Sequence, residues 1–224
     1  MTLDGPGDNR SSDIKTLIVG VGSMFGDDQA GWMAAQQLCA SLAAMHASGE
    51  PSGDIARTHA FGSDHGETIH PAEFRGTWGV CEVRLATIPL DVIDWLENID
   101  TLIVIDACQS ESAPGTIRRL QLTELPGFET PSEFQDAADA TDESAQRSRT
   151  PVTPYQSASS HDFDILAVLQ LAERTGRLPQ QVEFWAIDGE RFSLDHAISQ
   201  SVQAAIPGLV HQVLHRVTRS ISAA

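Results

Sequence analysis

Short apolar runs alternate with longer amphipathic stretches along most of the chain. Apolar runs bounded by turn residues predict strands at residues 16–21, 83–86, 101–106, 117–122 and 182–187. Apolar residues at helical spacing predict helices at about 30–47, 90–98, from 165 to a stop at Gly176, and 201–217. Strand and helix alternate after residue 13, which favours parallel βαβ units. We therefore expect one α/β domain with a mostly parallel twisted sheet of about five strands and helices on both faces.

Three segments lack this periodicity. Residues 1–13 hold no apolar run and predict a disordered N-terminal tail. Residues 48–80 are rich in Gly, His and Thr and are interpreted as an insertion or a weakly paired stretch. Residues 126–157 are acidic and poor in large apolar residues, which is typical of a mobile surface loop. The folded unit is therefore expected over residues 14–224, with insertions near 48–80 and 126–157.

Composition narrows the function classes. The 224 residues are 41% hydrophobic and can bury one good core. A formal net charge of −17 disfavours unaided binding to nucleic acid or to an anionic membrane surface. No apolar run approaches the ~20 residues of a membrane span, and no signal-peptide core is present. Three widely spaced cysteines argue against a disulfide framework or a zinc ribbon and favour a packing role in a reducing cytoplasm.

The turn after the first strand carries the first candidate chemistry. Gly20, Gly22 and Gly26 loosen it, and Asp27 and Asp28 follow at the carboxyl end of a central strand. Open α/β sheets bind their ligands at that edge. Two carboxylates would repel a phosphate, so the turn favours a cation or proton transfer instead.

Two further potential ligands fall at predicted element ends. Asp106 ends the strand at 101–106, and His161 precedes the helix that begins near residue 165. A helix N-terminus favours the neutral imidazole, which is the form that binds metal. Two carboxylates and an imidazole suit a divalent transition metal with open coordination positions. Each residue alone is more often a cap or turn residue, and only the coincidence of Asp28, Asp106 and His161 supports a site.

The motifs resemble those of the maturation endopeptidases of nickel–iron hydrogenases. The resemblance runs through most of the chain and rests on VGVGS at 19–23 with GDD at 26–28, IVIDA at 103–107 with APGT at 113–116, SSH at 159–161, and GRLP at 176–179. This sequence departs from the family pattern at Ser23, Gln29 and Asp162, where asparagine, glycine and glycine are usual.

The resemblance implies an activity and a site. It implies a cytoplasmic endopeptidase that removes a C-terminal extension from a nickel-loaded hydrogenase large-subunit precursor. Asp28, Asp106 and His161 would be both the catalytic residues and the residues that engage nickel, the metal being supplied largely by the substrate. Two alternatives remain open: a non-catalytic nickel-sensing chaperone or binding module with the same three residues, and, less favoured, a receiver-type signalling domain. The strand at 182–187 has no lysine to contact a phosphoryl group, which counts against the receiver.

Other candidate residues favour ordinary structural roles. His59, His65 and His70 are interpreted as part of a solvated loop, and His211 and His215 as a solvated or core-edge helix face. Cys108 lies close to Asp106 in sequence, but no neighbour is evident that would lower its pKa, so we expect a buried structural thiol.

Overall fold

The computed structural model describes residues 15–48, 72–76, 79–125, 128, 156–157 and 165–219. The predicted tail at 1–13 lies outside these residues and stays a prediction. The described strands are β1 (Lys15–Val21), β2 (Ala72–Gly76), β3 (Gly79–Ala86), β4 (Thr101–Gln109), β5 (Ile117–Gln121), β6 (Gln156–Ser157) and β7 (Gln181–Asp188). The helices are α1 (Ala30–Ser48), α2 (Val92–Trp95), α3 (Ile165–Arg174) and α4 (Gln200–Arg219), with 3-10 turns η1 (Gly26–Gln29), η2 (Pro89–Asp91) and η3 (Leu122–Glu124).

All seven strands belong to one mixed sheet. Six of them follow the order β2-β3-β1-β4-β7-β5. β3, β1, β4 and β7 run parallel to one another, whereas β2 and β5 pair antiparallel at the two edges. β6 pairs antiparallel with the end of β4, where Cys108 lies opposite Ser157. The same end of β4 pairs with β7 on its other side, so β6 continues the position that β1 occupies up to Ile105.

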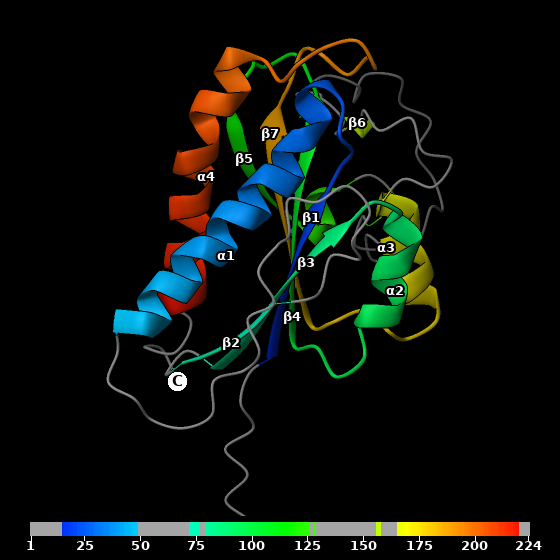
Figure 1. Ribbon diagram of the computed structural model, residues 1–224. Helices are drawn as coiled ribbons and strands as arrows, with labels where there is room; N and C mark the ends of the chain where they lie inside the picture. The colour runs from blue at the N-terminus through cyan, green and yellow to red at the C-terminus, as the bar shows by residue number, and fades with distance from the viewer. Residues whose placement is uncertain are drawn as a thin grey trace, which may run out of the picture.

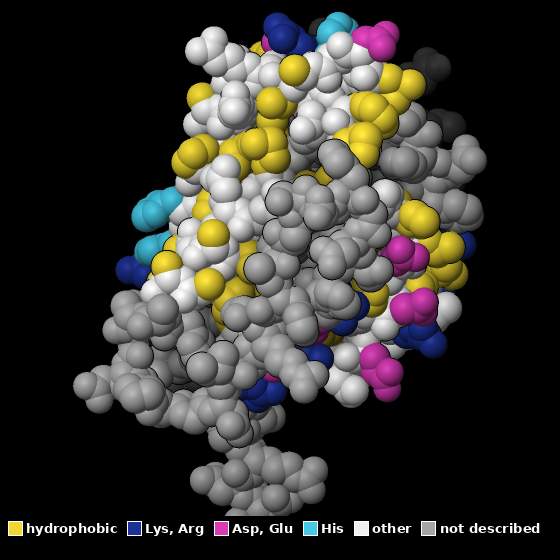
Figure 2. Space-filling view, viewed as in Figure 1, with side chains coloured by type: hydrophobic (Ala, Val, Ile, Leu, Met, Phe, Trp, Pro, Cys, Tyr) yellow, Lys and Arg dark blue, Asp and Glu magenta, His cyan; other side chains and the backbone are white. Residues whose placement is uncertain are grey.

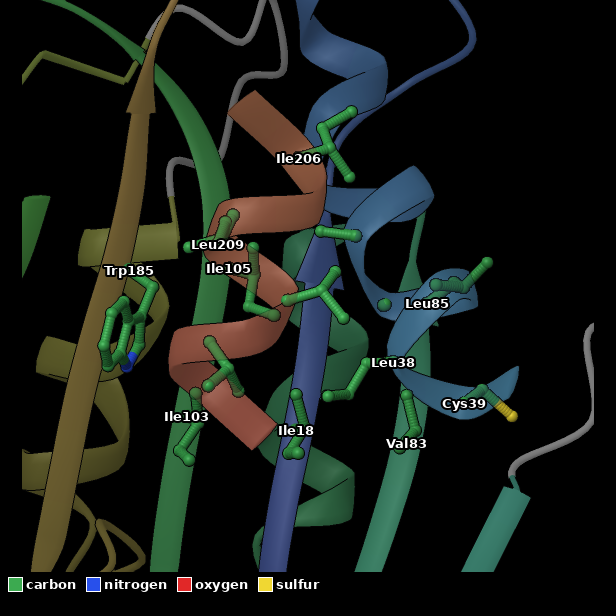
Figure 3. Close-up of a cluster of buried hydrophobic side chains, with 14 of the residues drawn as sticks. Ile18, Leu38, Cys39, Val83, Leu85, Ile103, Ile105, Trp185, Ile206 and Leu209 are labelled. Atoms are coloured by element: carbon green, nitrogen blue, oxygen red, sulfur yellow. The ribbon is translucent and has the colours of Figure 1, made fainter. Parts of the chain in front are cut away.

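Helices cover both faces of the sheet. Figure 1 shows α1 and α4 on one face and α2 and α3 on the other. Successive residues of a strand point to opposite faces, so Ile18 packs under α1 and α4 while Leu17 and Val19 pack under α2 and α3. Figure 3 shows the first of these layers, where Leu38 of α1 and Leu209 of α4 meet the isoleucines of β1 and β4. Burial on both faces explains why the central strands are continuously apolar in sequence.

The predicted fold class is confirmed, with three differences in detail. The described sheet has seven strands instead of about five, because short antiparallel strands extend it. The helix expected at 90–98 is only the η2 turn followed by one turn of α2, and Asn98 has a left-handed φ of 59° soon afterwards. The stretch at 48–80 ends in paired strand, since it holds β2 and the first residues of β3.

The stretch at 126–157 is not surface loop throughout. Phe128 is buried in the layer under α2 and α3, and Gln156 and Ser157 form β6. An isolated aromatic and two polar residues carry no periodic signal, which is why the sequence did not reveal these contacts. The acidic residues between them lie outside the described part of the chain. No helix among the described residues has the length and apolarity to cross a membrane.

Candidate active site at the carboxyl edge of the sheet

The two neighbouring aspartates of the η1 turn have different environments. Asp27 is fully buried, and its carboxylate accepts hydrogen bonds from the backbone N–H groups of Glu190 (2.8 Å), Arg191 (2.9 Å) and Ser199 (2.6 Å). Gly26 lies so close to the Arg191 carbonyl that a Cβ there would collide with it, and its φ is +52°. Asp27 therefore fastens the loop between β7 and α4 to the turn after β1, which is a structural role.

Asp28 is buried as well, with 5% of its surface exposed, but it is not satisfied. Its Oδ1 has no hydrogen-bond partner within the described part of the chain. A buried oxygen without a partner costs about 1–3 kcal/mol in folding free energy. Such an atom is expected where a ligand, an ion or a water molecule completes the site. This difference makes Asp28, and not Asp27, the candidate for binding a ligand at this turn.

Asp106 lies on β4 at the same edge of the sheet. It is 1% exposed, and its Oδ1 accepts a hydrogen bond from the backbone N–H of Ala107 at 2.8 Å. It shares the face of β4 with Val104 and Cys108, which pack toward α2 and α3. The start of α1 packs directly on β4, because a Cβ on Gly31 would come within 2.6 Å of the Ile105 carbonyl oxygen. The η1 turn and the end of β4 are therefore neighbours.

A further buried carboxylate, which the sequence analysis missed, lies on the strand next to Asp106, two positions along the β4–β7 pairing. Asp188 ends β7 and is 1% exposed, and it pairs with Cys108 in the β4–β7 register. Its Oδ1 accepts from Ser110 Oγ (2.6 Å) and Cys108 Sγ (3.3 Å) and forms an ion pair with Arg118 of β5 (3.0 Å). The Oδ2 of Asp188 and the Nε of Arg118 have no partner in the described chain. The rule that selected Asp106, an acid at the end of an apolar strand, would also have found Asp188.

Cys108 is a protonated thiol in this arrangement. Burial, with the negative charge of Asp188 next in importance, raises the pKa of Cys108 to about 12, although Arg118 partly opposes the shift. A thiol with this pKa is not an activated nucleophile near neutral pH. All three cysteines are free and buried, as expected. Cys108 nevertheless belongs to a polar cluster and does not serve only as apolar packing.

The third predicted ligand, His161, lies outside the described residues, as do His59, His65 and His70. Convergence of Asp28, Asp106 and His161 therefore stays a prediction. Within the described ranges, no three His, Cys, Asp or Glu side chains are grouped so as to hold a metal ion. His211 and His215 stack on the exposed side of α4 with ring centroids 6.4 Å apart, which confirms a solvated helix face.

Structural comparison relates this architecture to known proteins. An endopeptidase from Escherichia coli is similar with a TM-score of 0.55 and 18% identity, over 92% of this chain and 94% of that one. The hydrogenase maturating endopeptidase HybD from E. coli is similar with a TM-score of 0.53 and 18% identity, over 92% of this chain and 94% of that one. The [NiFe] hydrogenase maturation protease HycI from Thermococcus kodakarensis KOD1 is similar with a TM-score of 0.51 and 13% identity, over 93% of this chain and 95% of that one.

The chain has the fold of the hydrogenase maturation endopeptidases. No family model and no curated protein matches it by sequence. The resemblance seen in the motifs is thus confirmed for the fold, and the maturation-endopeptidase fold spans nearly the whole chain. In this fold the three described acids Asp28, Asp106 and Asp188 stand at the carboxyl edge of the parallel strands, where open α/β sheets hold their ligands.

Proposed function

We propose that this protein is a hydrogenase maturation endopeptidase. Its substrate would be a nickel-loaded hydrogenase large-subunit precursor, from which it removes a C-terminal extension in the cytoplasm. The observation that carries the proposal is the contrast within the η1 turn, where Asp27 accepts three backbone hydrogen bonds and Asp28 keeps a buried oxygen unpaired. On a maturation-endopeptidase fold, an unpaired buried carboxylate oxygen supports the proposal, because a substrate-borne metal would give it a partner.

Chain length supports a place for His161 in the same site. Ser157 pairs with Cys108 at the end of β4, two residues from Asp106. His161 follows Ser157 by four residues, and a chain of that length spans at most ~14 Å. It also precedes the first residue of α3 by four residues. The polypeptide can therefore bring the imidazole to Asp106 without rearranging the sheet.

The chemistry follows from burial and from the substrate's metal. Asp28 and Asp106 are nearly excluded from water, so their interaction with a cation is stronger than it would be on the surface. With His161 they would engage the nickel of the precursor, and that metal would polarise the scissile carbonyl or a bound water molecule. One carboxylate can then accept the proton of the attacking water. A cysteine nucleophile is not needed, and the raised pKa of Cys108 argues against one.

A cleavage assay tests the proposal. Purified protein is mixed with a large-subunit precursor prepared with or without nickel, and release of the C-terminal peptide is followed by mass spectrometry. We expect cleavage of the loaded precursor only. Asp28→Asn and His161→Ala should abolish it, whereas Asp94→Asn, the same kind of change at a well exposed acid of α2, should leave it unchanged.

One result would contradict the endopeptidase activity, and another would contradict only its metal-guided mechanism. If the wild-type protein binds the loaded precursor but never shortens it, the protein is a nickel-sensing chaperone or binding module. If Cys108→Ala is the one substitution that stops cleavage, the metal-guided mechanism is wrong.

A further inference from the structure

A cavity of about 750 Å³ opens at the other edge of the sheet, where the parallel strands begin. It lies between that edge and the last turns of α4. Its floor carries Thr16 of β1, Thr101 of β4 and Gln181 of β7, and α4 contributes residues spaced at three and four along one stripe. The complete lining is Thr16, Asp100, Thr101, Arg119, Gln180, Gln181, Trp185, Gln212, His215, Arg216 and Arg219.

The lining is locally cationic. Figure 2 shows histidine and basic side chains gathered over α4, at the left side of the view. Three guanidinium groups line the cavity, those of Arg119, Arg216 and Arg219, against a single lining carboxylate, Asp100. The chain as a whole has 31 acidic and only 14 basic side chains, so this concentration of arginine runs against its composition.

A buried carboxylate beside the cavity shows that these arginines bind acid groups. Glu183 is 3% exposed and binds Arg119 through two contacts, Nε to Oε2 at 3.1 Å and a terminal nitrogen to Oε1 at 3.0 Å. Arg216 Nε donates to the same Oε1 at 2.6 Å. A guanidinium carries five N–H donors, so Arg119 keeps donors that Glu183 does not use.

Other donors in the lining remain available. The side chain of Arg219 makes no hydrogen bond or ion pair among the described residues. The indole Nε1 of Trp185 is buried and has no acceptor within the described chain, although buried tryptophan N–H groups usually find one. Arg119 stacks over the same ring, with its guanidinium carbon 5.6 Å from the ring centroid. The amides of Gln180 and Gln212 add neutral donors.

We propose that this cavity binds a small-molecule oxyanion with two or more phosphate or carboxylate groups. Planar guanidinium groups bind such oxygens in pairs, and several of them around one cavity select for more than one acid group. The position is separate from the proposed active site, because the seven residue-to-residue steps of β7 from Gln181 to Asp188 span roughly 23 Å. The test of the oxyanion site is therefore independent of the test of the endopeptidase activity.

Calorimetric titration of the full-length protein with citrate and with inorganic pyrophosphate, in buffered salt of physiological strength, tests the site. We expect one equivalent of at least one probe to bind with a Kd below about 1 mM, and the probe that binds tells carboxylate from phosphoryl ligands. Arg219→Ala should weaken binding at least fivefold, since it removes an unpaired guanidinium. Arg177→Ala is the matched control: Arg177 is an exposed arginine paired weakly with Asp94 of α2, and its loss should change nothing.

Glu183→Gln gives a test of opposite sign. The neutral amide releases Arg119 and Arg216 from their internal carboxylate, so the added anion should bind several-fold more tightly. The added anion should also raise the thermal midpoint of Glu183→Gln by more than it raises the midpoint of the wild-type protein. Binding that is undetectable for both probes, or equal in wild type and Arg219→Ala, would overturn the proposal. If Glu183→Gln does not fold, the Arg219→Ala comparison alone decides.

Discussion

The two edges of the sheet both bury charged side chains, but they differ in how completely those charges are paired. At the edge where strands begin, Glu183 is held by two arginines. At the edge where strands end, Asp28 and Asp188 each keep one buried oxygen without a partner in the described chain. Burial of charge alone thus does not mark the candidate active site. The unpaired buried oxygen does, because folding gains nothing from leaving it unpaired.

The same comparison holds at closer range between Asp27 and Asp28. The residues are adjacent and of the same type, yet only the first is saturated by backbone N–H groups. We expect substitutions at Asp27 to act on stability and substitutions at Asp28 to act on activity.

The largest expected effect is on catalysis by Asp28→Asn. Removing a carboxylate that engages the metal or accepts a proton should lower the cleavage rate by at least about a hundredfold. The free energy of unfolding should change little, since no protein hydrogen bond to Oδ1 is lost. Rates from mass spectrometry and urea unfolding measured on one preparation would check both. A large loss of stability in Asp28→Asn would contradict the proposal that Asp27 acts on stability and Asp28 on activity.

Asp27→Ala should have the next largest effect, on stability. It leaves three buried backbone N–H groups of the β7–α4 loop without an acceptor, and we expect a loss of about 3 kcal/mol. Urea unfolding measures it, and the residual folded protein should still cleave the precursor slowly. Unchanged stability would show that the loop is fastened by other contacts.

Asp188→Asn should destabilise the protein by about 2 kcal/mol, because it breaks the ion pair with Arg118 inside the fold. We set this below the loss expected for a fully buried pair, since the Arg118 side chain is 21% exposed and partly solvated. Arg118→Met with Asp188→Asn should recover part of the loss, which a double-mutant cycle would measure. A loss in Asp188→Asn no larger than that of an exposed change such as Asp94→Asn would mean that the pair contributes nothing.

The smallest expected effect concerns the reactivity of Cys108. The charge of Asp188 helps to raise the pKa of this thiol, so Asp188→Asn should lower it and increase the thiolate fraction. Because the folded-state pKa lies above the ordinary value of 9.0, the thiol stabilises the fold below about pH 9 and loses that contribution as the pH rises toward 12.

Alkylation followed by mass spectrometry at pH 9 measures the change in thiolate fraction, and Cys81 in the same molecule is the control. Burial raises its pKa as well, but Asp188 is not among the causes. We expect the ratio of Cys108 to Cys81 labelling to rise several-fold. A rise shared equally by both thiols would indicate general loosening of the fold and not a change at Cys108.

Sequence alone determined the class of fold and the order of its elements. The strands at 16–21, 101–106 and 182–187 are apolar on both faces, and the amphipathic helices at about 30–47 and 201–217 supply the apolar surface that covers one face. Hydrophobic periodicity is local, so it survives in the sequence without knowledge of the partners. The same local signal placed Asp28 and Asp106 at strand ends.

Tertiary structure alone decided which of these acids has hydrogen-bond partners for its buried oxygens. Asp27 and Asp28 differ only through a loop more than 160 residues away, which supplies amides to one and not to the other. The Arg118–Asp188–Cys108 cluster joins three strands, and β6 and Phe128 join the sheet and core without a periodic pattern. Hydrogen-bond partners and burial are properties of contacts between distant segments. Strand-end position is therefore readable along the chain, whereas the pairing of a buried charge exists only once the chain has folded.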